Sequence, residues 1–347
     1  MTIKCNKCKK PAVIYLAYGK HSLCINHFND FFEKRFRKTI RMYNLTNNKD
    51  YIGVATSGGK DSMVLLYLMN KLYKKSPTKI CALFVDEGTP GYSNKTKEVV
   101  ETFCKREKIK LVSSSHKKEF GISTGEIAEK YNKKEGTLCT YCGVLRRDTL
   151  NRLAEKEKIT KVATGHNLDD EAQTVLMNMF SNDAIRLFRT GPLAGIIDLG
   201  EDIRPRIKPF YLTPEKEIGA YALYNNISFH DCNCPFYSEA KRNHYRAILN
   251  ETEVKYPGSK FGLIRSFLKL KDVINIDKIT TNNHDRSKIR KCKICNNVSS
   301  QDICSSCRLL KELNIGRKIW FQKNQVQDPN PKSLEWKDYN NKKSKKN

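Results

Sequence analysis

The chain has 347 residues, with 64 lysines and arginines against 37 aspartates and glutamates, which gives a formal net charge of +27. Its 39% hydrophobic and 10% aromatic residues exclude wholesale disorder. Its longest apolar run, Met63–Met69, is far shorter than the roughly 20 residues of a membrane span, and the N-terminus has no signal-peptide pattern. We therefore expect a cytoplasmic protein with no membrane partner. The charge favours a nucleic acid as partner, unless a lysine-rich genome composition explains the excess.

Four side chains with metal-ligand chemistry lie near the N-terminus, in the pairs Cys5-x2-Cys8 and Cys24-x2-His27. Two residues between ligands let a tight turn aim both side chains at one ion, and two such turns complete a tetrahedron. The segment is too poor in apolar residues to fold unaided, so bound Zn²⁺ is expected to supply folding free energy. We therefore expect a zinc finger over residues 1–30.

A basic and aromatic segment follows this finger. Phe32, Phe36, Ile40 and Tyr43 recur at helical spacing, which predicts a helical linker over residues 31–50. The five cations at residues 34–41 fit either contacts with phosphates or a solvated helix face.

From residue 51 onward, short β-type runs alternate with helical periodicity. Strands are expected at 51–56, 80–86, 109–113 and 160–164, and helices at 60–74, 94–107, 144–158 and 168–180. This alternation predicts an α/β fold, with a parallel sheet flanked by helices, although the strand order cannot be read from spacing. Three more helical segments extend this domain, which we place at residues 51–275: 213–225, 238–251 and 257–270.

Near the other end, two further C-x2-C turns bring four cysteines together: Cys292, Cys295, Cys304 and Cys307. The same geometric argument predicts a second structural Zn²⁺ site, in a finger over residues 288–320, and so two Zn²⁺ per chain. Residues 321–347 form a basic, lysine-rich tail that is expected to be disordered.

A glycine-rich loop joins the first expected strand of the α/β domain to the first helix. Its six residues are Ser57, Gly58, Gly59, Lys60, Asp61 and Ser62. Glycines let the backbone approach phosphate oxygens, the helix N-terminus favours an anion, and Lys60 adds a point charge. The loop is not a Walker A motif. After a strand, SGGKDS instead resembles the PP-loop of the ATP-pyrophosphatases, and this resemblance implies that the loop holds the pyrophosphate of ATP.

A second candidate element is the string ATGHNLDDEA at residues 163–172, which ends a strand and opens a helix. Ligands in open α/β sheets bind at the carboxyl ends of strands, so Gly165 and Asp170 are expected at the nucleotide, and paired carboxylates can hold Mg²⁺. The alternative is structural, with Asp169 as the N-cap of the helix. Asp86 ends another expected strand, where it either binds nucleotide or serves a turn.

The central pair Cys139-x2-Cys142 has no second pair nearby, so a closed zinc site is poorly supported there. A third cysteine from residues 232–234 would give three thiolates. Three thiolates on a [4Fe–4S] cluster leave one iron open for an exogenous ligand. Cys81 and Cys104 are expected to be small core residues.

Together these motifs resemble the tRNA 2-thiouridine synthetases of the TtcA/TtuA type, and most of all their archaeal and eukaryotic members that thiolate the wobble uridine. The resemblance extends to about residue 320. It rests on the N-terminal finger, SGGKDS, FVDEGTPGY, CTYCGVLRR, TGHNLDDEAQTVLMN, a late cysteine and the C-terminal finger.

The resemblance implies an oxygen-sensitive [4Fe–4S] cluster on Cys139, Cys142 and one late cysteine. Cys234 begins the string CPF and precedes His244 by ten residues, a placement that fits the third ligand of the family. The extra Cys232 departs from the family pattern and is the alternative ligand.

The resemblance also implies a reaction. ATP would bind with Mg²⁺ near Asp170, and the C2 oxygen of a flipped-out uridine would attack the α-phosphate. Sulfide carried on the open iron would then attack C2, and AMP would depart. The catalytic residues implied are Lys60, Asp61, Asp170 and Arg146, although Arg146 could equally contact a tRNA phosphate.

The expected partners are tRNA, a sulfur donor that is either sulfide or a thiocarboxylated ubiquitin-like protein, and a second copy of the chain in a homodimer. One alternative is another PP-loop reaction on tRNA: 2-thiocytidine formation, 2-thiouridine at another position, or lysidine-type ligation. Lysidine-type enzymes lack the flanking zinc sites and the central cysteine pair. The other alternative is a non-catalytic, zinc-dependent tRNA-binding protein, against which the intact Lys60, Asp61 and Asp170 argue.

Overall fold

The computed structural model describes residues 3–131, 137–194, 204–237, 242–274, 290–299, 301–313 and 315. The predicted tail, residues 321–347, lies outside these ranges, as do residues 238–241 at the start of one predicted helix. Within the described part of the chain, no helix combines the length and the apolar character that crossing a membrane requires.

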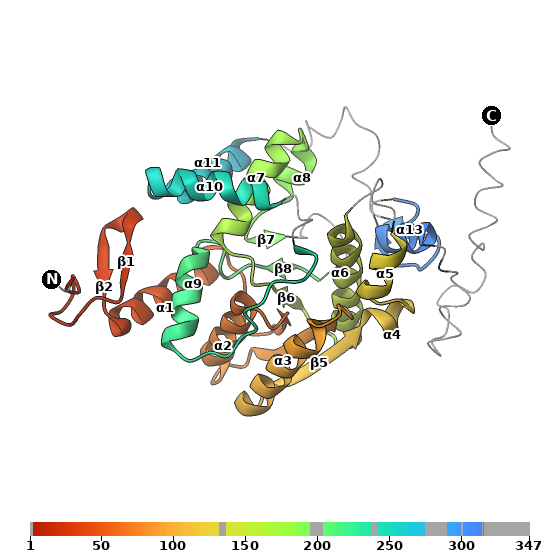
Figure 1. Cartoon of the computed structure of the whole chain (residues 1–347), viewed down its shortest axis with the longest axis horizontal. Coiled ribbons are helices and arrows are strands. Elements are labelled where there is room, and N and C mark those ends of the chain that lie inside the picture. Colours follow the sequence, from red (N-terminus) through yellow and green to blue (C-terminus); the bar gives the residue numbers. More distant parts are fainter. Residues whose placement is uncertain are drawn as a thin grey trace.

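A six-stranded sheet forms the centre of the molecule (Figure 1). Its strands, in spatial order, are β5 (Lys110–Ser115), β4 (Lys79–Asp86), β3 (Tyr51–Thr56), β6 (Lys161–Ala163), β8 (Arg206–Ile207) and β7 (Leu193–Ala194). All neighbours pair in parallel except β7 and β8, which are antiparallel. The prediction of a parallel α/β sheet is therefore confirmed. Strands β7 and β8 have two residues each, too few to produce a periodic signal.

The connections between the strands create a crevice at one edge of the sheet. The chain runs from β3 outward to β4 and β5, and then returns to place β6 on the other side of β3. Open α/β sheets bind ligands where the strand order reverses in this way, beyond the carboxyl ends of the strands. The loops after β3 and β6 are the glycine-rich loop and the GHNLDD string, so the topology brings both predicted motifs to this point.

Helices cover the sheet and carry most of the buried apolar surface. The four that follow strands β3 to β6 are α2 (Lys60–Tyr73), α3 (Ser93–Glu107), α6 (Leu138–Lys156) and α7 (Leu168–Phe180). Shorter elements fill the remaining connections: α4 (His116–Phe120), α5 (Thr124–Lys130), α8 (Ala184–Phe188) and α9 (Glu215–Tyr224). Helices α10 (Arg242–Lys255) and α11 (Ser259–Val273) lie beside α7, as predicted for the late helical segments.

Helix α6 begins earlier than its sequence pattern predicts. The prediction placed its start at Val144, but the helix begins at Leu138. Leu138, Tyr141 and Leu145 recur at helical spacing and are buried against Ile127 and neighbouring apolar residues, which stabilises the extra turns. The central cysteines therefore lie in the first turns of a helix rather than in a knuckle.

Each end of the chain carries a small hairpin followed by a helix. At the N-terminus, β1 (Ile14–Leu16) and β2 (His21–Leu23), joined by the 3-10 turn η1 (Ala17–Gly19), precede α1 (Ile25–Met42). At the C-terminus, β9 (Arg290–Lys291) and β10 (Val298–Ser299) precede α13 (Ser305–Glu312). The first module docks on α9, where the Tyr18 hydroxyl donates to Glu217 at 2.7 Å. The second docks on α6, where the Tyr141 hydroxyl donates to Glu312 at 3.3 Å.

Helix α1 contains the basic, aromatic segment predicted to be helical. Its aromatic residues form core, since Phe28, Phe32 and Phe36 are buried and Phe32 stacks on Tyr221 with ring centroids 4.4 Å apart. Its cation Arg35 pairs with buried Glu217 at 2.8 Å, which joins this helix to α9.

Candidate active site and metal centres

The loop between β3 and α2 is held in shape by its own serines. The Ser57 backbone N–H donates to Ser62 Oγ at 3.0 Å, and that hydroxyl donates to the Gly59 carbonyl oxygen at 2.9 Å. Gly58 has φ +78°, and a Cβ there would lie 2.9 Å from the Thr96 carbonyl oxygen, so neither the backbone nor the space admits a larger residue. The loop is thus formed in advance and presents the N-terminus of α2 to an anion.

The loop after β6 packs directly against this first loop. A Cβ on Gly165 would lie 3.1 Å from Ser62 N and from the Asp61 carbonyl carbon, so this glycine permits the close approach. Two motifs about a hundred residues apart therefore line one crevice, as the sequence analysis expected for Gly165.

Helix α7 is capped by Asn167, not by Asp169 as the structural alternative proposed. Asn167 Oδ1 accepts the Asp170 N–H at 3.0 Å, and Asp170 Oδ2 accepts the Asn167 N–H at 3.3 Å, which completes a capping box. Asp169 lies two positions beyond the N-cap and so cannot take that role. It instead accepts the Glu215 N–H at 2.7 Å and pairs with Lys260, so it fixes the start of α9.

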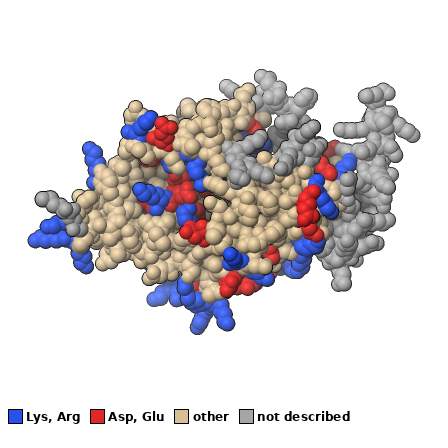
Figure 2. Space-filling model, in the orientation of Figure 1, with Lys and Arg blue, Asp and Glu red and all other residues tan. Residues whose placement is uncertain are grey.

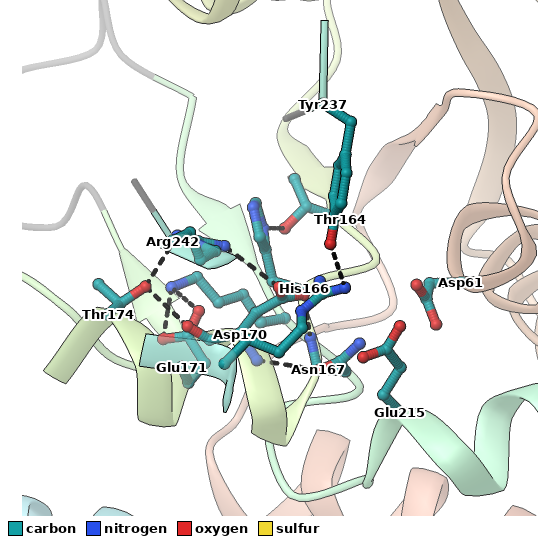
Figure 3. A network of polar contacts seen from close by, with 12 residues as sticks. Asp61, Thr164, His166, Asn167, Asp170, Glu171, Thr174, Glu215, Tyr237 and Arg242 are labelled. Carbon is teal, nitrogen blue, oxygen red and sulfur yellow. Dashed lines mark hydrogen bonds and ion pairs between the residues drawn. The ribbon is translucent and has the colours of Figure 1, made fainter. Parts of the chain in front are cut away.

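Two carboxylates lie next to Lys60 at the mouth of the phosphate loop, those of Asp61 and Glu215, which lie close to each other (Figure 3). Lys60 Nζ lies 2.6 Å from Glu215 Oε1 and 3.2 Å from Asp61 Oδ2. Asp61 Oδ1 is buried and has no hydrogen-bond partner among the described residues. Burial raises the pKa of Asp61 to about 7, with Asp170 and Glu215 raising it further and Lys60 opposing them. An orphaned carboxylate oxygen among acidic neighbours fits a hard divalent cation such as Mg²⁺. Glu215 was not predicted, since its only signal was its place at the start of a helix.

The remaining acidic residues of α7 are already paired with cations. Asp170 Oδ1 accepts from Arg242 at 3.1 Å, and Glu171 lies 2.7 Å from Lys208. Burial raises the pKa of Asp170, and Arg242 opposes that rise. In the space-filling view, basic and acidic side chains together border the hollow at the centre of this face (Figure 2).

The pKa of His166 is lowered both by its surroundings and by nearby cations. Its Nδ1 lies 2.9 Å from the Thr164 hydroxyl. Although the ring keeps contact with solvent, the surrounding protein removes much of its hydration, and together with four cations this lowers the pKa of His166 to about 3. The cations are Lys208, Arg242, Arg146 and Arg206.

The central cysteines face the late-cysteine segment across the same edge. Cys139 Sγ donates to the Phe236 carbonyl oxygen at 3.7 Å, two residues beyond Cys234. Cys142 and Cys234 respond to the same neighbours: burial raises the pKa of both thiols, Glu87 raises them further, and Arg146 lowers them. Cys139 therefore contacts the late-cysteine segment, and Cys142 and Cys234 lie near the same two charged residues.

Two other features bear on these central cysteines. Cys232 and Cys139 are both exposed to solvent. In the described part of the chain, the central sulfurs belong to no group whose ligand atoms all lie within 4.8 Å of one another. They are thus more widely spaced than the ligands of a single ion.

Arg146 is held by Glu87, a residue that the sequence analysis did not single out. Arg146 Nη1 donates to Glu87 Oε1 at 2.9 Å, and the Glu87 side chain is only 15% exposed. The preceding Asp86 accepts the Gly88 N–H at 2.9 Å, which is the turn role weighed for it. Its role in nucleotide binding stays a prediction. The only sequence signal that Glu87 could pair with Arg146 was its position just after a strand.

Both terminal ligand sets form compact groups. The donor atoms of Cys5, Cys8, Cys24 and His27 all lie within 4.8 Å of one another, as do those of Cys292, Cys295, Cys304 and Cys307. Two sulfurs bound tetrahedrally at about 2.3 Å from one ion would lie roughly 3.8 Å apart. The Cys8 and Cys24 sulfurs are 3.7 Å apart, and those of Cys295 and Cys304 are 3.6 Å apart. Each group therefore fits one metal ion.

A family model described as a PP-loop domain matches residues 29–253 of the chain. These residues contain the phosphate loop, the acidic crevice and the central cysteines. The chain is accordingly an α/β protein of the PP-loop class.

The chain belongs to the tRNA 2-thiolation family of PP-loop proteins. It is 35% identical to a tRNA-5-methyluridine(54) 2-sulfurtransferase of Pyrococcus horikoshii, over 90% of this chain and 96% of that protein. It is 33% identical to cytoplasmic tRNA 2-thiolation protein 1 of Danio rerio, over 91% of this chain and 90% of the relative. The solved U34-tRNA thiolase NcsA of Methanococcus maripaludis, described with its [4Fe-4S] cluster, superimposes with a TM-score of 0.74 at 31% identity, covering 90% and 97% of the two chains. The resemblance seen in the sequence is confirmed.

Proposed function

We propose that this protein is a tRNA-uridine 2-sulfurtransferase that uses ATP to replace the C2 oxygen of a tRNA uridine with sulfur. The observation that carries the proposal is the convergence of two kinds of chemistry at one edge of the sheet. A preformed phosphate loop and three carboxylates lie there. The central cysteines lie beside the Glu87–Arg146 pair at the same edge. Activation by a nucleotide and delivery of sulfur both require such a site.

The phosphate loop binds the nucleotide in this proposal. The N–H groups at the start of α2 and the charge of Lys60 hold the pyrophosphate portion of ATP. Asp61, Asp170 and Glu215 would hold Mg²⁺, which supplies neutralising charge to the phosphates. Lys60 pairs with Asp61 and Glu215, so it would exchange these partners for phosphate when ATP binds.

The reaction then proceeds in two displacements. The uridine C2 oxygen attacks the α-phosphorus, the bond to pyrophosphate breaks, and the uridine becomes adenylated. A sulfur nucleophile next attacks C2, and AMP leaves with the original oxygen. Arg146 is placed by Glu87 to stabilise the charge that develops at the phosphate.

The central cysteines would hold a [4Fe–4S] cluster, with Cys139 and Cys142 from α6 and Cys234 from the late segment. Three thiolates fit such a cluster, which when bound supplies an iron with a free position for a sulfur ligand. The contact of Cys139 with Phe236 and the shared neighbours of Cys142 and Cys234 support this choice over Cys232. The two terminal groups would each hold one structural Zn²⁺.

The target within tRNA is a finer part of the proposal. We assign the wobble uridine, because an anticodon loop is single-stranded and releases a base at low cost. One relative is named for position 54 and the structural relative for U34, so the family contains both. We further propose cytoplasmic action, a homodimer, and sulfide or a thiocarboxylated ubiquitin-like protein as the donor.

One anaerobic assay tests the proposal. The protein is reconstituted with iron and sulfide, supplied with ATP, Mg²⁺, sulfide and unmodified tRNA, and the product nucleosides are separated by mass spectrometry. We expect 2-thiouridine, and we expect it to vanish when U34 of the tRNA is replaced by cytidine but not when the uridine at position 54 is replaced.

Other outcomes of the same assay would reject parts of the proposal. Formation of 2-thiocytidine would reject the substrate base, and loss of product only with the position-54 replacement would reject the wobble assignment. No thiolated nucleoside, despite bound ATP, would reject sulfur transfer itself. A matched pair of variants, Cys234→Ser and Cys232→Ser, tests the ligand choice. Only the first should abolish the visible absorption of the cluster.

A further inference from the structure

A cavity of about 700 Å³ lies between α6, the β7–β8 edge of the sheet and the C-terminal four-cysteine module. That volume is within the range of ligand-binding pockets. Among its described lining residues, five are cations and two are carboxylates: Arg147, Arg152, Arg204, Arg206 and Lys291 against Asp148 and Glu155. None of these seven belongs to the nucleotide or metal sites described above.

Two of the arginines in this cavity lack an acidic partner. Arg152 is compensated, because its Nε lies 3.3 Å from Asp148 Oδ1. Arg147 forms no ion pair with any described residue. Arg206 donates to the Arg147 carbonyl oxygen at 3.3 Å and to Asn151 Oδ1 at 3.0 Å, and both acceptors are neutral. Positive charge therefore collects on this wall of the cavity.

Burial and nearby cations destabilise the charge of both arginines. Burial lowers the pKa of Arg147 together with Arg146 and Arg186, and burial lowers that of Arg206 to about 10 together with Arg147 and Arg146. Partly desolvated cations without counter-charge carry a free-energy cost that an anionic ligand would remove. A guanidinium also matches the geometry of phosphate oxygens.

The cavity adjoins the reaction site through a single turn of α6. Arg146 and Arg147 are consecutive, and successive residues of an α-helix point about 100° apart. Arg146 therefore reaches Glu87 beside the central cysteines, while Arg147 lines the cavity. Arg206, from β8, is among the cations that act on His166 in the crevice. A polymer that fills the cavity would continue directly into the site.

We propose that this cavity binds the phosphodiester backbone of the tRNA, with Arg147 and Arg206 on phosphate oxygens, and so directs the target nucleotide toward Arg146 and the central cysteines. The inference rests on the proposed function and adds to it a backbone-binding site walled by the C-terminal module. That module then serves two roles, since it docks on α6 and also completes the RNA-binding surface.

The test measures tRNA binding by fluorescence anisotropy between 50 and 200 mM KCl, without ATP or sulfur donor. The double variant Arg147→Ala/Arg206→Ala should bind about tenfold more weakly, and the slope of log affinity against log salt should fall by about 1.5, as expected for two lost phosphate contacts. Arg147→Lys/Arg206→Lys should keep most of that slope, because it retains the charges. In thiolation assays the alanine pair should raise KM for tRNA about tenfold with kcat unchanged.

A matched control is Arg106→Ala, which removes an exposed arginine of α3 that pairs with Glu107 at 3.0 Å outside the cavity. It should change tRNA affinity less than twofold. ATP binding and the unfolding midpoint of each variant report its folding. If the alanine pair unfolds, tRNA affinity and its salt dependence are compared instead between the lysine pair, which keeps both charges, and the single variant Arg206→Gln, which removes one.

The proposal is overturned if the alanine pair binds tRNA with wild-type affinity and salt dependence. It is also overturned if inorganic phosphate binds at these arginines of the wild-type protein without changing its affinity for tRNA. That outcome would make the cavity a site for free anions. The binding assay does not depend on sulfur transfer. Absence of 2-thiouridine in the thiolation assay would therefore reject the proposed function without rejecting tRNA binding at this cavity.

Discussion

The cysteines at the two ends of the chain and those in its middle share the C-x2-C spacing but lie in different surroundings. Each terminal group combines a hairpin with the start of a helix, and its donor atoms all lie within 4.8 Å of one another. The central pair lies in the first turns of α6, with Cys139 exposed and its contact partner Phe236 97 residues further along the chain.

This difference shows what the spacing of a cysteine pair can and cannot reveal. When a second pair follows within about fifteen residues, local turns close a four-ligand shell, and the result is a structural site. When the third ligand is remote and no fourth is present, the site stays open, and openness is what a reacting centre requires. The following predictions test that contrast, from the largest expected effect to the smallest.

The largest effect is expected from opening a closed site. Cys292→Ser removes a ligand that is 1% exposed, and the lost metal-binding free energy, on the order of 10 kcal/mol, should unfold β9, β10 and α13 locally. Metal analysis should show one fewer ion per chain, and hydrogen exchange should show loss of protection in α13. The control Arg308→Ala should change neither. Retained metal and full protection of α13 would mean that this group is not a structural metal site.

Removal of a central cysteine should instead affect activity and leave stability unchanged. Cys139→Ser is expected to lower the rate of 2-thiouridine formation by roughly 10³-fold, because the open site loses a ligand. As Cys139 is exposed, the free energy of unfolding should change by less than about 0.5 kcal/mol. Rates come from nucleoside analysis and stability from urea unfolding. If Cys139→Ser unfolded the protein as strongly as Cys292→Ser, the contrast between open and closed sites would fail.

His116, at the start of α4, should make stability depend on pH. It is fully buried, its Nδ1 lies 3.2 Å from the Thr124 hydroxyl, and burial lowers its pKa to about 4. An unfolded histidine titrates near 6.5, so the folded state binds fewer protons between these values. Its contribution to stability is complete above about pH 6.5 and is lost as pH falls toward 4.

Wild-type protein should therefore lose about 2 kcal/mol more unfolding free energy than His116→Asn between pH 7 and pH 5. Urea unfolding at the two pH values measures this difference, and the exposed His244→Asn serves as the control. Parallel loss in wild type and His116→Asn would show that this histidine does not titrate as its burial requires.

The smallest effect is expected from the ion pair that positions Arg146. Glu87→Gln keeps a hydrogen-bond acceptor but removes the charge that faces Arg146 at 2.9 Å. We expect kcat to fall about tenfold with KM for ATP unchanged, because the guanidinium is less well placed. Glu101→Gln, on the exposed face of α3, is the matched control. A rise in KM for ATP at constant kcat would instead place Glu87 in nucleotide binding.

Much of the fold and the site could be predicted because the relevant signals are local. Periodicity predicted β3 at residues 51–56 and α7 at residues 168–180, where the structure has them. Elements of two residues, such as β7 and β8, were missed because they contain no period to detect. The start of α6 was misplaced because its first turns are stabilised by apolar contacts with Ile127, in the preceding helix, and with the remote α13.

The sequence by itself determined the features that depend on a few consecutive residues: the phosphate loop, where glycines and a helix N-terminus act together, and the ligand pairs, where tight turns act. Only the tertiary structure decided which distant residues meet. It joined Lys60 to Glu215, Arg146 to Glu87, and Arg147 to Arg206. Spacing along the chain carries no information about such pairs, because packing of the sheet and helices brings them together. The electrostatic character of the site therefore emerges only from the folded molecule.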